Sequence, residues 1–508
     1  MPKGYLAFHL HAHLPFVYHP EHERFLEERW YFDAIVDTYV PLLSNFSKLV
    51  SLNVPFRLSM TLSPTLLAMF RHPQLGERFM AHLARQEELC HRELERTAND
   101  PAFRPVVEMY RERLAAVRST WDACQGNLAN GFAELQREGY LELVTCGVTH
   151  GFLPHMQLIP GAVSRQLRIA VENHERTLGL APDGIWLPEC AYYPGLEAEL
   201  LNHGLLYFFC DTHALHLGLP RSLRGPFSHV YLPNGVAAFA RDVESSKQVW
   251  SAREGYPGDG LYRDFYRDVG FDLPLEYVAP YVESGNTRVL TGFKYYAITG
   301  ETEHKQPYNP ELARAKAEEH ARHFVWCRER QIEWLTERLD RAPVVVAPYD
   351  AELFGHWWFE GPDFLFHVLR NAAESPVLRA VAAKDYMLRY QSAQIVTPNP
   401  STWGDGGYNR FWTNQANEWI YPHLAAGARR LVRAEFGDAE RHRLAERELA
   451  LAQASDWAFI MATGTSPDYA ALRTTQHLLQ LRRLLESPGG GPESASAAGA
   501  AAPAGSEL

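Results

Sequence analysis

The sequence lacks an excess of positive charge, a long hydrophobic run and any paired cysteine pattern. Its 49 Lys and Arg are outnumbered by 61 Asp and Glu, giving a net charge of −12, which argues against a nucleic-acid or anionic-membrane partner. No apolar run approaches the roughly 18 residues of a membrane span, and we expect no signal peptide. The six scattered cysteines indicate reduced thiols in a cytoplasmic protein.

Aromatic residues, in contrast, are abundant. The chain has 12 Trp, 24 Tyr and 26 Phe, and many adjoin glycine, proline, histidine or an acidic residue. Sugar rings stack on such aromatic faces, although any single aromatic residue more often fills the core of a large domain.

Strand-like and helical segments alternate from residue 5 to about residue 400. This alternation is typical of parallel βα units. Several expected strands end in polar residues, which favours a closed barrel whose chemistry lies at the carboxyl ends of its strands. The expected strands cover residues 5–14, 54–62, 141–147, 184–187, 205–210, 236–242, 289–295 and 344–350.

Changes in composition divide the chain further. We expect the barrel to cover residues 1–76 and 139–400, because residues 77–138 have the charged, long-period pattern of a helical insertion. Helices at about 415–436, 438–461 and 468–486 predict a C-terminal helical domain over residues 401–486. The Gly/Ala/Pro/Ser-rich residues 487–508 are expected to be disordered.

Three histidines in the first strand, His9, His11 and His13, alternate and therefore point to one face. They are compatible with a metal site, as in amidohydrolase-type barrels. They are equally compatible with hydrogen bonding to a polar substrate. A further histidine, His150, lies in a loop bounded by glycine and proline after the third strand.

Two carboxylates, Glu189 and Asp350, each follow a buried strand and a proline, beside aromatic residues. A carboxylate at a buried strand end is costly unless it is used. The pair has the form of a glycosidase site, in which one acid attacks the anomeric carbon and the other protonates the leaving oxygen. Glu352 competes with Asp350 for the acid role, because it points the same way if the chain stays extended. For either acid alone, a structural ion pair or helix cap is an equal alternative.

The motifs of this chain resemble those of glycoside hydrolase family 57 and, within it, of the 1,4-α-glucan branching enzymes. The resemblance covers nearly the whole chain except its last residues. Its five short regions, in the family's order, are His11-Ala12-His13-Leu14-Pro15, Gly147-Val148-Thr149-His150, Trp186-Leu187-Pro188-Glu189, Pro348-Tyr349-Asp350-Ala351-Glu352-Leu353-Phe354-Gly355-His356-Trp357, and the loop of Trp403-Gly404 with Trp412.

The resemblance implies a (β/α)7 barrel with a helical insertion and a C-terminal helical domain. It implies a retaining mechanism without metal or cofactor, with Glu189 as nucleophile and Asp350 as acid/base. The substrate would be an α-1,4-glucan such as amylose or glycogen, and the oligomeric state stays open. The further residues that the resemblance assigns to substrate binding are Arg241, Gly258, Trp403 and Asp456, with His11, His13 and His150 lining the pocket and Trp412 stacking on a glucose ring.

One segment departs from the family pattern. Branching enzymes of this family often carry a longer loop before the strand at Val236, with a tyrosine that closes over the acceptor. Here the segment from Arg224 to Gly235 is short, and Tyr231 is its only tyrosine. Because a lid excludes water and commits the intermediate to an acceptor, this segment bears on the balance between transfer and hydrolysis.

Other functions are compatible with parts of the pattern. An α-amylase or a 4-α-glucanotransferase would use the same scaffold and the same two carboxylates. A metal-dependent hydrolase would use His9, His11, His13 and His150. A glucan-binding protein without activity is disfavoured, because both carboxylates are present.

Overall fold

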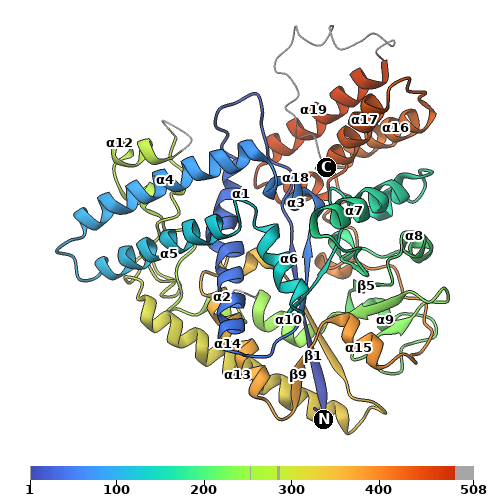
Figure 1. Ribbon diagram of the computed structural model, residues 1–508, viewed down its shortest axis with the longest axis horizontal. Helices are drawn as coiled ribbons and strands as arrows, with labels where there is room; N and C mark the ends of the chain where they lie inside the picture. Colours follow the sequence, from blue (N-terminus) through green and yellow to red (C-terminus); the bar gives the residue numbers. More distant parts are fainter. Residues whose placement is uncertain (1, 252, 283–286, 487–508) are drawn as a thin grey trace.

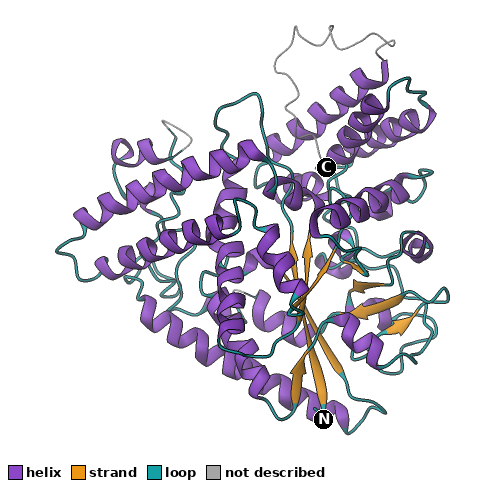
Figure 2. Ribbon diagram, in the orientation of Figure 1, coloured by secondary structure: helices purple, strands orange, loops and turns teal. Residues whose placement is uncertain are grey.

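Parallel strands form a closed barrel at the centre of the molecule (Figures 1 and 2). The computed structural model describes residues 2–251, 253–282 and 287–486. Within these residues the barrel has seven strands, the number that the family resemblance implied and one fewer than the residue pattern suggested. They are β1 (Gly4–Ala12), β2 (Leu58–Leu62), β3 (Leu141–Val144), β4 (Gly184–Ile185), β5 (Tyr207–Cys210), β7 (Ala237–Ala240) and β8 (Val344–Asp350).

Backbone hydrogen bonds join the two strand groups of the barrel to each other at both of their edges. The strands run in the order β8-β1-β2-β3 on one side and β4-β5-β7 on the other. Between β3 and β4, the Trp186 N–H donates to the Thr145 carbonyl at 2.9 Å; between β7 and β8, the Asp242 N–H donates to the Val346 carbonyl at 2.8 Å. Two short strands lie outside this ring: β6 (Val230–Tyr231) is antiparallel to β7, and β9 (Leu378–Ala380) pairs with the start of β1.

Alternation along the strands gives the barrel interior an apolar floor and a polar mouth. In β1, Tyr5 and Ala7 belong to the buried cluster inside the barrel, so His9 and His11 continue the same face toward the carboxyl end. In β8, Asp350 lies opposite His11 in the register. The two-residue period of the strands therefore carries these polar side chains into one space.

Helices cover the outside of the barrel and begin at recognisable caps. The Ser63 hydroxyl accepts from the Leu66 N–H at the start of α3, and Asn309 caps the long α13. The first helical segment changes to a π-helical turn at Ile35–Tyr39. The helices are α1 (Glu28–Ala34), α2 (Val40–Ser51), α3 (Pro64–Phe70), α7 (Ala162–Leu178), α8 (Leu196–Asn202), α9 (Thr212–His216), α10 (Val243–Trp250), α13 (Pro310–Thr336), α14 (Gly361–Glu374) and α15 (Ala383–Arg389).

Helices α4 (Pro73–Arg96), α5 (Arg104–Ala123) and α6 (Ala129–Arg137) lie between β2 and β3, where the charged pattern predicts helices. Leu75, Phe79 and Leu83 form the buried stripe of α4, at the spacing of an amphipathic helix. Figure 1 shows α4 and α5 extending to one side of the barrel, near the short α12 (Leu275–Val278). The short α11 (Val269–Asp272) precedes α12.

Four C-terminal helices lie above the carboxyl end of β1 (Figure 1). None of the described helices combines the length and apolar character needed to cross a bilayer. The predicted tail, residues 487–508, lies outside the described residues. The helices are α16 (Ile420–Arg433), α17 (Ala439–Ala452), α18 (Ser455–Thr463) and α19 (Pro467–Glu486).

The structure corrects two sequence-based expectations. Residues 438–461 do not form one helix: the helix breaks between α17 and α18, where the Ser455 N–H donates to the carbonyl of His150 in a barrel loop. Residues 289–295 do not form a strand. The Asp268 carboxylate accepts there from the Thr291 N–H and hydroxyl, both at 2.7 Å, and from the Gly292 N–H at 3.0 Å. These side-chain bonds replace a strand ladder.

Candidate active site

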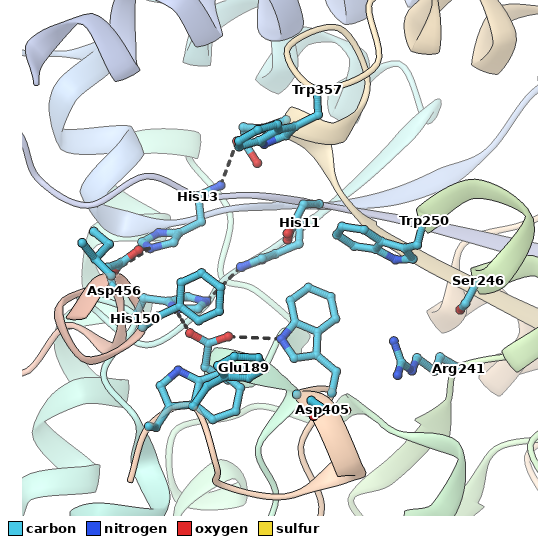
Figure 3. A pocket seen from close by; sticks show the side chains of 18 of the residues that line it. His11, His13, His150, Glu189, Arg241, Ser246, Trp250, Trp357, Asp405 and Asp456 are labelled. Atoms are coloured by element: carbon cyan, nitrogen blue, oxygen red, sulfur yellow. Dashed lines mark hydrogen bonds and ion pairs between the residues drawn. The ribbon is translucent and has the colours of Figure 1, made fainter. Parts of the chain in front are cut away.

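A cavity of about 710 Å³ opens at the carboxyl ends of the strands (Figure 3). Nine of the ten site residues predicted from the sequence line it; Gly258, in the turn Tyr256–Gly258, is not among the described lining residues. The nine are His11, His13, His150, Glu189, Arg241, Asp350, Trp403, Trp412 and Asp456.

Glu189 is held in an uncommon backbone conformation just after β4. Its φ is +60° and that of Cys190 is +53°, a region that non-glycine residues rarely adopt and that is often associated with function. The Trp403 indole N–H donates to Glu189 Oε2 at 3.1 Å, and the Ser455 hydroxyl donates to Oε1 at 2.7 Å. Burial raises the pKa of Glu189 to about 7, although these two hydrogen bonds favour the ionised form.

Asp350 lies in a different environment in the same cavity. Burial raises the pKa of its carboxyl well above the ordinary value, and the negative charges of Glu352, Glu189 and Asp456 raise it further. The two carboxyls thus differ in which protonation state their surroundings stabilise. Glu189 has donors that stabilise its charge, whereas Asp350 favours its protonated form. This is the division of roles expected of a nucleophile and an acid.

Glu352, the rival for the acid role, also lines the cavity but is held by two donors. Its Oε1 accepts from the Tyr39 hydroxyl and, at 3.1 Å, from the His13 N–H. Burial raises its pKa to about 7. For Asp350, the described part of the chain provides no side-chain hydrogen-bond partner. The geometry therefore favours Asp350 as the group free to meet a substrate oxygen.

The histidines at the cavity differ in the direction of their pKa shifts. His11 Nε2 lies 2.9 Å from His150 Nε2, and burial lowers the pKa of both rings well below the ordinary value. His13 Nε2 lies 3.1 Å from Asp456 Oδ2. Burial opposes a charge on His13, but the Asp456 carboxylate more than offsets it, so its pKa is raised. His9 lies below, between Ser59 and Thr61, each 2.9 Å from one ring nitrogen.

Among the residues that the structure describes, two groups of three have ligand atoms within 4.8 Å of one another: His11 with Cys146 and His150, and His13 with His150 and Asp456. Burial raises the pKa of the Cys146 thiol well above its ordinary value. Among the described histidines of this region, only His11 Nδ1 lacks a protein partner. Metal binding would thus require most of these hydrogen bonds to break.

Several lining residues were not predicted from the sequence. Trp357, 56 % exposed, stacks on Phe265 with ring centres 4.6 Å apart, and Trp250 meets Trp403 edge-on at 5.9 Å. Figure 3 places Trp250 and Ser246 on the same side of the cavity as Arg241, opposite His13 and Asp456. Trp357 is the last residue of the motif that begins at Pro348, so the sequence carried a signal for it although no site role was assigned to it.

Two predicted sugar-binding residues are constrained by the protein. Arg241 Nε lies 2.6 Å from Asp211 Oδ2, which fixes the guanidinium at the rim. Trp412 is 1 % exposed and stacks on Phe152 with centres 5.0 Å apart. Only a small part of Trp412 faces the cavity, so its stacking on glucose stays a prediction.

The short segment before β7 lies away from the cavity mouth. Tyr231 pairs with Ala237, the first residue of β7, and Arg224 forms an ion pair with Asp340, which precedes β8. Both contacts are at the amino ends of the strands. No residue of 224–235, all described, lines the cavity, so this segment places no tyrosine over it.

Comparison with known proteins gives consistent matches. Residues 7–330 match the sequence model of glycosyl hydrolase family 57, and residues 428–501 match that of the C-terminal region of 1,4-α-glucan branching enzymes. The chain is 33% identical to a 1,4-α-glucan branching enzyme of Thermococcus kodakarensis, over 95% of this chain and 73% of that protein.

Solved structures that are similar along nearly the whole chain include an α-amylase and a branching enzyme. The α-amylase AmyC of Thermotoga maritima is 41% identical with a TM-score of 0.89, covering 95% of this chain and 93% of AmyC. A branching enzyme of family 57 from Pyrococcus horikoshii is 32% identical with a TM-score of 0.85, covering 95% of this chain and 90% of that enzyme.

Proposed function

The chain belongs to glycosyl hydrolase family 57, and from this membership we propose that it is a 1,4-α-glucan branching enzyme, which cuts α-1,4 bonds and forms α-1,6 branches. The observation that carries the proposal is the pair of carboxyls in one cavity: Glu189 accepts two hydrogen bonds, whereas burial and neighbouring carboxylates raise the pKa of Asp350 well above its ordinary value. The matched C-terminal region supports branching in particular.

The first step transfers the glucan chain to the protein. A Glu189 oxygen attacks C1 of an internal glucosyl unit while Asp350 gives its proton to the departing glycosidic oxygen. The C1–O bond of the old linkage breaks, and a C1–O bond to Glu189 forms. Asp350 is then ionised and Glu189 is an ester.

The second step transfers the chain to an acceptor. Asp350 removes the proton from a 6-hydroxyl of another glucan, whose oxygen attacks C1 and displaces the Glu189 carboxylate. Two inversions at C1 retain the α configuration, and both carboxyls regain their starting protonation. The substrate is thus an α-1,4-glucan such as amylose or glycogen, recognised partly by Trp403 and Trp357.

The experiment incubates the protein with amylose and then digests the product with a debranching enzyme. We expect new α-1,6 linkages, seen as short chains released by debranching, with few new reducing ends before it. Reducing ends that rise without any new α-1,6 linkage would refute branching. The Glu189→Gln variant is the matched control, and neither product should appear with it.

An α-glucan hydrolase of the α-amylase type is the second candidate, favoured by two observations. Segment 224–235 leaves the cavity without a covering tyrosine, and the 41% identical AmyC is an α-amylase. Water would replace the 6-hydroxyl in the second step. The same assay decides between them through the ratio of new α-1,6 linkages to new reducing ends.

We also infer a cytoplasmic location. All six cysteines are free, five of them buried, and this supports a reducing compartment.

A further inference from the structure

Ser455, the first residue of α18, is clamped between the nucleophile position and a barrel loop. The residue is 2 % exposed. Its N–H donates to the His150 carbonyl at 3.0 Å, and its hydroxyl oxygen lies 2.8 Å from His150 Nδ1 and 2.7 Å from Glu189 Oε1. His150 itself has a φ of +57°. Ser455 thus links His150 and Glu189, which both have a positive φ that non-glycine residues rarely adopt.

The chemistry of these groups gives the hydrogen bonds a direction. An ionised carboxylate only accepts hydrogen bonds, so the single proton of the Ser455 hydroxyl goes to Glu189. His150 Nδ1 must then carry a proton and donate to the hydroxyl oxygen, which leaves His150 Nε2 as an acceptor. His11 Nε2–H donates to it at 2.9 Å, and His11 Nδ1, now a bare acceptor, is the ring nitrogen without a protein partner.

The resulting chain runs from His11 through His150 and Ser455 to Glu189 (Figure 3 shows its two rings beside Glu189). Each imidazole needs one proton only, and burial keeps both rings neutral because it lowers the pKa of each well below its ordinary value. This series of hydrogen bonds therefore orients the Ser455 hydroxyl as a donor to Glu189 without placing a positive charge next to the carboxylate.

We propose that Ser455 is a positioning residue, whose hydroxyl, oriented by His150 and His11, fixes one oxygen of Glu189 and stabilises its carboxylate in both steps of the reaction. This rests on the proposed role of Glu189 as nucleophile. In the first step the hydroxyl holds the ionised carboxylate in place for attack on C1. In the second step it stabilises the carboxylate as it leaves C1.

Other groups also influence the ionisation of Glu189, and a Ser455 variant replaces none of them, although His150 and His11 lose the partner that orients their protons. They come from every element packed around the carboxyl: His11 and His13 from β1 and its end, Cys146 and His150 after β3, Asp350 and Glu352 at the end of β8, Tyr421 on α16 and Asp456 on α18.

The test measures kcat/KM against pH for Ser455→Ala and Ser455→Thr, with an α-maltosyl fluoride as donor and fluoride release as the readout. Fluoride leaves without a proton from Asp350, so the acidic limb of the profile reports Glu189 in the free protein. We expect Ser455→Ala to lower kcat/KM about 10- to 100-fold. Its acidic limb should move to higher pH, because the lost hydrogen bond favoured the ionised carboxylate.

The threonine variant keeps the hydroxyl and should hold the acidic limb near its wild-type position. Ser228→Ala, a buried serine remote from the cavity, is the matched control and should change neither quantity. Should Ser455→Ala fail to fold, Ser455→Cys, nearly isosteric with a weaker donor, carries the same expected shift. An acidic limb that stays in place in the folded alanine or cysteine variant would overturn the proposal.

Glu189→Gln separates this inference from the proposed function. A Gln variant with near-normal activity would remove Glu189 as the nucleophile and with it the whole mechanism. An inactive Gln variant together with an unshifted Ser455→Ala profile would refute only the positioning role.

Discussion

At the scale of single residues, the site buries three carboxyls, those of Glu189, Asp350 and Glu352. Burial raises the pKa of Glu189 and of Glu352 to about 7 and that of Asp350 well above its ordinary value. A group whose folded-state pKa is raised destabilises the fold once it is ionised. The chemistry therefore has a measurable cost in stability.

Glu189→Gln should be more stable than the wild type at pH 8 and equally stable below about pH 4.5. The pKa of Glu189 rises from 4.5 to about 7 on folding, so the folded state holds a proton that the unfolded state has lost between these values. The wild type loses stability as the pH rises through this window, by up to about 3 kcal/mol, and Gln does not. Thermal melts at pH 4.5 and pH 8 measure the difference.

A stabilisation of Glu189→Gln that is the same at both pH values would contradict this explanation, since it would come from packing and not from ionisation. Glu197→Gln, at a carboxyl outside the cavity, is a suitable control for the substitution itself.

At the residue scale, the strand pattern predicted the groups that end strands, and the family resemblance supplied Trp403, Trp412 and Asp456 from outside the strands, but neither predicted Ser455. Glu189 and Asp350 were predicted because each follows an apolar strand and a proline, a purely local signal. Ser455 has no such signal, since its contact with Glu189 depends on where α18 meets the barrel. The sequence also could not choose between Asp350 and Glu352, because the donor from Tyr39 to Glu352 spans 313 positions.

At the scale of elements, the π-helical turn Ile35–Tyr39 and the loop after β8 fit closely together. The Tyr39 hydroxyl donates to Glu352, and His356 Nδ1 lies 3.5 Å from Asp37 Oδ2. Gly355, with a φ of +113°, lies directly against this turn: a Cβ there would be 1.7 Å from the Asp37 carbonyl oxygen. A glycine is required for both reasons.

Gly355→Ala should lower both stability and activity by displacing this loop. The positive φ costs about 1–3 kcal/mol for a non-glycine residue, and the clash with a backbone atom adds about 1–3 kcal/mol. Gly300→Ala is the matched control, because its φ is +124° with nothing within 4 Å of the added Cβ. The difference between the melting temperatures of the two variants measures the destabilisation that the clash with Asp37 adds. A Gly355→Ala variant as stable as Gly300→Ala would contradict this clash.

Element types were predictable where a segment is apolar and periodic. The barrel strands and the buried stripe of α4 follow from their periods of about 2 and 3.6 residues. Residues 289–295 were wrongly assigned to a strand, because the carboxylate of Asp268 accepts hydrogen bonds from their N–H groups. Such a contact leaves no periodic pattern in the sequence. The break before Ser455 was missed for a similar reason, since its N–H donates to a distant loop.

At the scale of the whole molecule, the C-terminal helices pack against the barrel. Leu449 and Leu481 share a buried cluster with Leu167 of α7 and with strand residues. The Thr149 hydroxyl donates to the Ala450 carbonyl. Barrel and helices therefore bury apolar surface against each other, a contact that composition alone could not place.

We expect one cooperative thermal transition for the barrel and the C-terminal helices together. Because the shared cluster links them, loss of activity and the change in tryptophan fluorescence should occur at the same temperature. Limited proteolysis during the melt supplies the third probe. An earlier transition that frees residues 420–486 while the barrel stays folded would contradict this expectation.

The most direct test of the mechanism is to trap the covalent intermediate. In Asp350→Asn, an α-maltosyl fluoride can still react, because fluoride leaves without an acid, but no base activates the acceptor in the second step. Mass spectrometry of the digested protein should then find maltosyl on the peptide that contains Glu189. A sugar attached at Glu352, or no covalent adduct while fluoride is released, would contradict the assignment of Glu189 as the nucleophile.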